Sequence, residues 1–259
     1  METKKRGEII AIANQKGGVG KTTTAINLGA SLAIAEKHVL VVDVDPQANS
    51  TTGLGIDKTS VQHDIYSVIE GRCSLNEAII EHELKYLKVI PATRQFARFE
   101  LEVAAEEGNH LHLKNALAEV NGQFDYILVD LPPSLGIITI NALTAAESVL
   151  IPIQTEYYAL EGLSDLMDTI ERTKENFNPD LKIKGIILTM YDERTNLSKQ
   201  VEEEIRNFFK SKVYRAIIPR NIRLSEAPSF GKPIQLYAIK SAGSQAYMAL
   251  ANEIMGQTP

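Results

Sequence analysis

Short runs of consecutive apolar residues recur along the chain, and longer stretches with an apolar residue every three or four positions separate them. The runs are typical of strands buried on both faces, and the longer periodicity predicts amphipathic helices. The predicted strands are residues 9–13, 39–43, 87–90, 126–130, 149–153, 185–190 and 214–218. The clearest predicted helices are residues 24–33, 101–120, 162–177 and 197–212. This alternation predicts an α/β fold with a mostly parallel, twisted β-sheet and helices on both of its faces.

No low-complexity linker or repeat interrupts these elements in the 259 residues. We therefore predict a single domain over residues 9–256, preceded by a polar tail of residues 1–8 that we expect to be flexible. The apolar run behind the tail is too short for a secretory signal, and no window reaches the roughly 20 apolar residues of a membrane span. Cys73 is the only cysteine, which fits a reducing, cytoplasmic location.

A glycine-rich segment ending in Gly20-Lys21-Thr22 separates the first predicted strand from the first predicted helix. Strand, glycine-rich loop, Gly-Lys-Thr and helix, in this order, are typical of the P-loop NTPase fold. Backbone N–H groups of such a loop and the helix N-terminus bind phosphate oxygens. Lys21 would reach the β- and γ-phosphates of a nucleotide, and the Thr22 hydroxyl would ligate Mg²⁺. The predicted phosphate-binding residues are Lys16, Gly17, Gly18, Val19, Gly20, Lys21, Thr22 and Thr23.

The loop departs from the usual G-x-x-x-x-G-K-[ST] pattern at one position, because Gln15 stands where the first glycine is expected. A second lysine, Lys16, follows directly. One lysine is sufficient for the β- and γ-phosphates, so we expect Lys16 to have a different function.

Aspartates follow two of the predicted strands. Asp43 and Asp45 come at the end of the second strand, and Asp130 ends the fourth. Because ligands of parallel sheets bind at the carboxyl ends of the strands, these carboxylates are expected beside the phosphate loop. One of them could hold Mg²⁺, directly or through water, and another could orient an attacking water molecule.

The net charge is −6, yet residues 190–240 contain ten Lys or Arg and six Asp or Glu, a local balance of +4. A positive face on an acidic protein can bind the phosphate backbone of nucleic acid. The alternative, which charge alone favours, is a solvated helix face.

Together these motifs resemble those of the deviant Walker A ATPases and, within them, the ParA/Soj family of DNA-partition proteins. The motifs that carry the resemblance are residues 16–23, 43–49, 130–134, 188–196 and 217–228. The resemblance implies a slow ATP hydrolase that uses Mg²⁺ and forms a homodimer when ATP binds. In such a dimer Lys16 would reach the phosphates of the partner subunit, and the catalytic residues would be Lys16, Lys21 and Asp45. Asp130 would hold Mg²⁺ through water, with Asp45 also near the metal, while Asp43 would support the site.

The resemblance also implies the remaining ligands. Adenine would lie against Met190, Pro219 and Asn221. Non-specific double-stranded DNA would bind Arg194 and Arg223, with Arg220 and Lys199 as further contacts, which would place the protein on the nucleoid. A ParB/Spo0J-like centromere-binding partner would stimulate hydrolysis.

Two alternative functions use the same loop. A MinD-like membrane ATPase would need a basic amphipathic C-terminal helix, but no basic residue follows Lys240. The helical spacing of Tyr247, Leu250, Ala251 and Ile254 predicts a core-packing face instead, so we expect no stable membrane association. An ATP-dependent switch that acts on protein partners in replication initiation or transcription stays open. An iron–sulfur electron-transfer protein is excluded, since one cysteine per subunit cannot hold a four-iron cluster even in a dimer.

Overall fold

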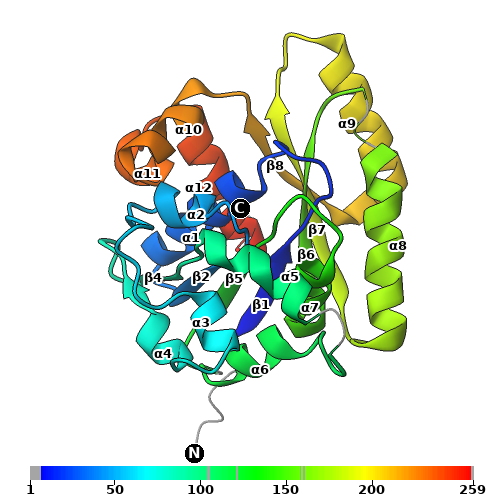
Figure 1. Cartoon of the computed structure of the whole chain (residues 1–259). Helices are drawn as coiled ribbons and strands as arrows, with labels where there is room; N and C mark the ends of the chain where they lie inside the picture. The colour runs from blue at the N-terminus through cyan, green and yellow to red at the C-terminus, as the bar shows by residue number, and fades with distance from the viewer. Residues whose placement is uncertain (1–6, 104–105, 121, 158, 160, 258–259) are drawn as a thin grey trace, which may run out of the picture.

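The computed structural model describes residues 7–103, 106–120, 122–157, 159 and 161–257 (Figure 1). Most of the predicted N-terminal tail, residues 1–6, therefore lies outside the described residues. Within the described residues, no helix is both long enough and apolar enough to cross a membrane.

A single eight-stranded sheet with the order β3-β4-β2-β5-β1-β6-β7-β8 forms the centre of the fold. All neighbouring strands pair in parallel except β3 and β4, which are antiparallel. The strands are β1 Glu8–Ile12, β2 Val39–Asp43, β3 Ile80–Glu81, β4 Leu87–Ile90, β5 Tyr126–Asp130, β6 Ser148–Gln154, β7 Lys182–Tyr191 and β8 Val213–Pro219. The seven predicted strands and the predicted fold class are confirmed. The strand that was not predicted, β3, has only two residues, too few to give a pattern.

Helices cover both faces of this sheet, as predicted (Figure 1). The α-helices are α1 Lys21–Ile34, α2 Asn49–Gly53, α3 Ile65–Ile69, α4 Leu75–Ala78, α5 Phe99–Glu102, α6 His112–Ala118, α7 Ile137–Ala145, α8 Glu161–Asn176, α9 Asn196–Phe209, α10 Ile222–Glu226, α11 Ile234–Tyr237 and α12 Ala242–Ile254. Short 3₁₀ helices are η1 Arg94–Arg98, η2 Lys210–Lys212 and η3 Ala227–Phe230.

The two faces of the sheet belong to two separate apolar clusters because successive side chains of a strand point to opposite sides. In β1, Ile9 and Ala11 pack in the cluster that contains residues of α3 to α9. Ile10 and Ile12 pack in the cluster that contains α1 and α10 to α12. Strands buried on both faces explain why their sequences are almost continuously apolar.

Two helix predictions were wrong in their extent. The predicted helix over residues 101–120 is two helices, because α5 ends at Glu102 and α6 begins at His112. Leu101, the first residue of the predicted helix, is 83% exposed. The predicted helix over residues 197–212 is an α-helix only to Phe209, where the positive φ of Lys210, 51°, interrupts it, and residues 210–212 form the 3₁₀ helix η2.

The register of the central strands places the predicted carboxylates side by side. Asp130 at the end of β5 is paired with Asp43 in β2 on one side and with Ile12 in β1 on the other. The glycine-rich loop leaves β1 directly after Ile12. The phosphate loop and the carboxylates therefore share the carboxyl edge of the sheet.

Candidate nucleotide-binding site

The glycine-rich loop connects β1 to α1 in a conformation that needs glycine. Gly18 and Gly20 have φ values of 77° and 94°, in the left-handed region where other residues are strained. Gly20 is the N-cap residue of α1, so the first N–H groups of this 14-residue helix open toward the loop. A loop of this kind followed by a helix N-terminus binds phosphate groups.

Side-chain hydrogen bonds hold the loop to the two strands beyond β1. Asn14 donates from Nδ2 to the carbonyl oxygen of Pro152 in β6 at 2.7 Å, and its Oδ1 accepts from the Lys16 N–H at 2.9 Å. Thr189 in β7 donates from Oγ1 to the Val19 carbonyl oxygen at 2.8 Å. These side-chain hydrogen bonds therefore help to fix the shape of the loop.

Lys21 lies inside the loop and is only 7% exposed. Its Nζ donates to the Lys16 carbonyl oxygen at 3.1 Å. Burial lowers the pKa of Lys21, and the carboxylates of Asp130 and Asp45 oppose that shift. The ammonium group is thus held at the point where the loop and the two carboxylates meet.

Asp130 is fully buried at the end of β5. Its Oδ2 accepts a hydrogen bond from the Ser50 hydroxyl at 2.6 Å, while its Oδ1 is buried without a hydrogen-bond partner among the described residues. Burial raises the pKa of Asp130 to about 6, and the hydrogen bond from Ser50 opposes this rise. A buried carboxylate oxygen without a partner fits a hydrated Mg²⁺ ion, which prefers oxygen ligands and retains several waters.

Asp43, the neighbour of Asp130, has its oxygens occupied by protein groups. It accepts from the Thr51 N–H and hydroxyl at 2.8 and 2.7 Å and from the Asp45 N–H at 3.1 Å. Burial, followed by the charge of Asp130, raises the pKa of Asp43 to about 7. These bonds anchor α2 to the sheet, which is consistent with the supporting role predicted for Asp43.

Asp45 lies in the turn that leads from β2 to α2 and is 6% exposed. Its Oδ1 accepts from the Gln47 N–H at 2.9 Å, and its carbonyl oxygen accepts from the Ala48 N–H at 2.8 Å. Ala48 has a left-handed φ of 55°, a conformation that costs an alanine about 1–2 kcal/mol. The strain lies within the turn that positions Asp45.

Lys16, in contrast to Lys21, extends toward another segment of the same chain. Its Nζ is 3.5 Å from Oε2 of Glu156, and the two side chains are 38% and 45% exposed. Lys16 is therefore reachable from outside the subunit, whereas Lys21 is not.

A cavity of about 390 Å³ opens beside the phosphate loop. Gly20 and Thr23 form its loop side, and Met190, Pro219 and Asn221 form part of the opposite side. The structure thus brings together the residues predicted to bind phosphate and those predicted to contact adenine. Met190 has a left-handed φ of 51°, and Asn221 caps α10 by accepting from the Arg223 N–H at 2.9 Å.

Three features of the site were not predicted. Ser50 and Thr51 donate to the two buried aspartates, although neither hydroxyl belongs to a phosphate-binding motif. Tyr247, predicted only to pack in the core, also lines the cavity. Arg220, predicted to contact DNA, lines the cavity as well. The position of Ser50 and Thr51 directly after the Asp43–Asn49 segment is the one feature of the sequence that could have indicated their part in the site.

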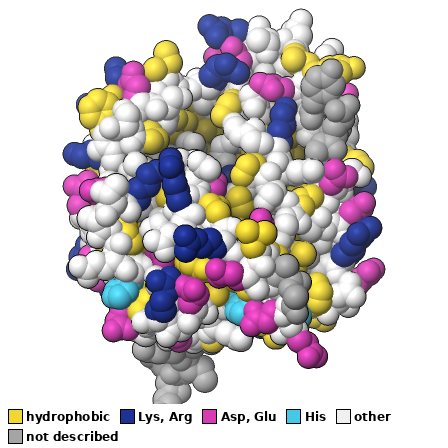
Figure 2. Space-filling view, in the orientation of Figure 1, with side chains coloured by type: hydrophobic (Ala, Val, Ile, Leu, Met, Phe, Trp, Pro, Cys, Tyr) yellow, Lys and Arg dark blue, Asp and Glu magenta, His cyan; other side chains and the backbone are white. Residues whose placement is uncertain are grey.

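The predicted DNA-binding residues lie on the surface near the ends of β7 and β8. Arg194 is paired with Asp192 through Nε at 2.8 Å and Nη2 at 2.6 Å, and Arg223 is paired with Glu226 at 2.8 Å. Lys199 is exposed on α9. The Arg220 N–H donates to the Tyr191 carbonyl oxygen at 2.9 Å, which joins the loops after β7 and β8. Figure 2 shows that basic and acidic side chains are interspersed on this view of the molecule, including its upper edge.

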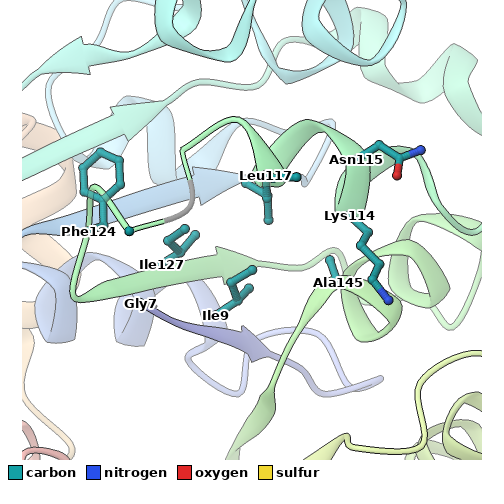
Figure 3. Close-up of a pocket in the computed structure, with 10 residues that line it drawn as sticks. Gly7, Ile9, Lys114, Asn115, Leu117, Phe124, Ile127 and Ala145 are labelled. Atoms are coloured by element: carbon teal, nitrogen blue, oxygen red, sulfur yellow. The ribbon is translucent and has the colours of Figure 1, made fainter. Parts of the chain in front are cut away.

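A second cavity, of about 210 Å³, lies near the amino ends of β1 and β5 (Figure 3). Figure 3 shows Ile9, Leu117 and Ile127 converging on it from β1, α6 and β5. Among its described lining residues only Lys114 and Asn115 have polar side chains. It is far from the phosphate loop along the strands and is mainly a gap in the apolar layer under α6.

Comparisons with known proteins agree with this geometry. A family model described as an AAA domain matches residues 7–183. The chromosome partitioning protein ParA of Myxococcus xanthus is 53% identical, with 96% of this chain and 88% of that protein covered. The sporulation initiation inhibitor protein Soj of Bacillus subtilis is 53% identical, with 96% and 98% covered.

Solved structures share the whole fold. Cobyrinic acid a,c-diamide synthase from Mycobacterium smegmatis, with bound ADP and magnesium, superposes with a TM-score of 0.85 at 34% identity, covering 96% of this chain and 94% of that chain. The cell division ATPase MinD of Pyrococcus furiosus superposes with a TM-score of 0.79 at 25% identity, covering 97% and 100%.

Proposed function

We infer that this chain, which belongs to the ParA/Soj family of chromosome-partitioning ATPases, is a magnesium-dependent ATP hydrolase that acts in DNA partition. The observation that carries this proposal is that the phosphate loop with Lys21, the carboxylates of Asp45 and Asp130, and a cavity lie together at one edge of the sheet. The Lys21 ammonium lies within the phosphate loop, close enough to Asp45 and Asp130 for both carboxylates to affect its pKa. The cavity beside the loop provides space for a base.

The phosphate loop would bind the β- and γ-phosphates of ATP through its backbone N–H groups and the N-terminus of α1. Lys21 would exchange its hydrogen bond to the Lys16 carbonyl oxygen for phosphate oxygens. The Thr22 hydroxyl and, through water, Asp130 Oδ1 would hold Mg²⁺. When bound, this ion supplies positive charge to the β- and γ-phosphate oxygens.

Asp45 would orient the attacking water, since its carboxylate sits at the edge of the site in a turn held by the Gln47 and Ala48 N–H groups. Attack on the γ-phosphorus breaks its bond to the oxygen that bridges the β- and γ-phosphates, and the products are ADP and inorganic phosphate. Met190, Pro219 and Asn221 would contact the adenine. The structural strain at Ala48 and Met190 falls in the segments assigned to water orientation and base contact.

Lys16 would act across a dimer. Its side chain is partly exposed and lies on the same loop as Lys21, so a second subunit facing the loop could place its ATP within reach of Lys16. Positive charge brought to the γ-phosphate from a partner stabilises the transition state in the way an arginine finger does. Hydrolysis would then require dimerisation.

Membership of this family implies interactions with DNA and with a ParB-like protein in general terms. We propose that Arg194 and Arg223, with Arg220 and Lys199, bind DNA phosphates without sequence preference and so keep the protein on the nucleoid. The ion pairs of Arg194 with Asp192 and of Arg223 with Glu226 are exposed. Ion pairs at the surface are screened by solvent and contribute little to stability, so a DNA phosphate can replace the carboxylate at little cost.

The membrane alternative has less support. Tyr247, Leu250, Ala251 and Ile254, the apolar face of α12, are buried in the cluster that includes α1 and β8. An interfacial helix needs such a face to be free for lipid. The buried face therefore supports the prediction that the protein forms no stable attachment to membranes.

The test is to measure phosphate release from ATP with and without Mg²⁺, and binding to a random-sequence DNA duplex with ATP or ADP at low and moderate salt. We expect slow, magnesium-dependent release and salt-sensitive DNA binding with ATP only. Absence of hydrolysis would overturn the enzymatic proposal. Hydrolysis without DNA binding in either nucleotide state would leave an ATPase that acts on protein partners.

A further inference from the structure

Tyr247 connects two parts of the site that lie far apart in the sequence. It belongs to α12, near the C-terminal end of the chain, and is only 1% exposed. Its side chain packs in the apolar cluster that also contains Ile12 of β1 and Ile218 of β8. Tyr247 nevertheless lines the cavity beside the phosphate loop, on which Met190 and Asn221 also lie.

The Tyr247 hydroxyl reaches the helix that begins at the phosphate loop. It lies 3.1 Å from Oγ1 of Thr24, and both atoms are buried. Thr24 is in the first turn of α1, where its N–H donates to the Gly20 carbonyl oxygen at 2.9 Å. A buried hydroxyl that loses its partner destabilises the folded protein, so this pair links α12 firmly to the first turn of α1.

We propose that Tyr247 is a positioning residue for the nucleotide, resting on the proposed function in which the cavity receives the base of ATP. Its side chain borders the cavity, and its hydroxyl ties α12 to the first turn of α1. The part of the cavity that would receive the base is therefore held at a fixed distance from the phosphate loop. A ligand gains from this arrangement only if it carries both a base and phosphates.

This role makes a prediction that a purely structural role does not. Loss of the Tyr247 ring or hydroxyl should weaken binding of ATP but not of inorganic tripolyphosphate, which contains the same phosphate chain without a base. A general loosening of the fold would weaken both ligands alike. The ratio of the two affinities therefore separates positioning from stability.

The experiment is calorimetric titration of ATP and of tripolyphosphate, each with Mg²⁺, into the wild type, Tyr247→Leu and Tyr247→Phe. We expect Tyr247→Leu to weaken ATP binding about tenfold and Tyr247→Phe about threefold, with tripolyphosphate affinity changed less than about twofold. Adding Thr24→Val to Tyr247→Phe should not restore ATP affinity, because the link between α12 and α1 stays broken even though no buried hydroxyl is then left unpaired.

Tyr214→Phe is the matched control. Tyr214 is a partly buried tyrosine of β8 whose hydroxyl donates to the Lys184 carbonyl oxygen at 3.4 Å, among residues that do not line the cavity. This substitution should leave the affinity ratio unchanged. Thermal unfolding of every variant identifies a misfolded protein, and Tyr247→Phe, which keeps the ring, provides the test if Tyr247→Leu does not fold.

Three results would overturn the proposal. Equal losses for ATP and tripolyphosphate would make Tyr247 a structural residue, and unchanged ATP affinity in Tyr247→Leu would remove it from the base site. Both results leave the proposed ATPase intact if the wild type hydrolyses ATP. A wild type that binds tripolyphosphate as tightly as ATP would show that the cavity does not receive the base, which would refute this inference and the proposed base site together.

Discussion

The Lys16 ammonium lies 3.5 Å from the Glu156 carboxylate of the same chain, and both side chains are partly exposed. Lys16 is the residue that we propose to reach the phosphates of a partner subunit. While it is paired with Glu156, part of its charge is satisfied within its own subunit. Glu156 thus competes with the partner's phosphates for Lys16.

We expect Glu156→Gln to favour the ATP-bound dimer by releasing Lys16. An exposed ion pair contributes about 0.2–1 kcal/mol, so the protein concentration needed for half-dimerisation should fall about two- to fivefold. Light scattering after size-exclusion chromatography with ATP, over a range of protein concentrations, measures this change. Lys16→Ala should have the opposite effect and abolish dimerisation and hydrolysis.

Glu171→Gln is the matched control for Glu156→Gln, because Glu171 forms an ion pair of similar exposure with Lys174 on α8, at 3.6 Å. It should not change dimerisation. If Glu156→Gln weakens the dimer instead, Glu156 itself must contribute to the interface, and the competition model would be wrong.

Asp45→Ala is expected to separate ATP binding from hydrolysis. The carboxylate touches no part of the phosphate loop by a hydrogen bond in the described structure, so its removal should leave ATP affinity within about threefold of the wild type. The rate of phosphate release should fall by about 100-fold or more, since positioned acid–base groups contribute about 10²–10⁴-fold. Phosphate release and ATP titration on the same preparation give both values, and unimpaired turnover would assign water orientation to another residue.

The sequence predicted the central part of this site better than its surroundings. Lys21, Asp43 and Asp130 could be placed together because parallel strands bring their carboxyl ends to one edge, whatever the loops between them do. The hydrogen bonds from Ser50 and Thr51 could not be predicted in this way. The Ser50–Asp130 pair joins positions 80 residues apart, and its partners are set by the turn at Ala48 and not by any periodicity.

The same limit applies to the outer helices and to Tyr247. A pattern of apolar spacing places Tyr247 on the buried face of α12 but does not reveal that the same residue borders a cavity. The helix α7 was missed for a related reason. Seven of its nine residues are buried, so it lacks the polar stripe that marks an amphipathic helix.

Ser50→Ala should weaken the use of magnesium by the ATPase. Removing this hydroxyl takes away the hydrogen bond to Oδ2 of the buried Asp130, which disfavours the charged carboxylate. We expect the Mg²⁺ concentration for half-maximal hydrolysis to rise about three- to tenfold, with a smaller change in ATP affinity. Ser148→Ala, which removes a buried serine that donates to Glu8 at 2.8 Å near the amino end of the sheet, is the matched control. An unchanged magnesium requirement in Ser50→Ala would mean that Asp130 does not serve the metal.

Arg194→Ala and Arg223→Ala should weaken DNA binding without preventing dimerisation. Each removes one cation that neutralises a DNA phosphate in each subunit, so the slope of log affinity against log salt should become shallower by about 0.9 for every phosphate left without its arginine. At low salt we expect about a fivefold to tenfold decrease in affinity for each variant, independent of DNA sequence. Fluorescence anisotropy with ATP and a random-sequence duplex at several salt concentrations measures both quantities.

Arg72→Ala removes a similarly exposed, ion-paired arginine after α3, outside the basic stretch, and should leave the slope unchanged. If Arg194→Ala or Arg223→Ala no longer dimerises, that arginine has a structural role, and the basic residues near β7 and β8 do not act simply as a DNA-binding surface.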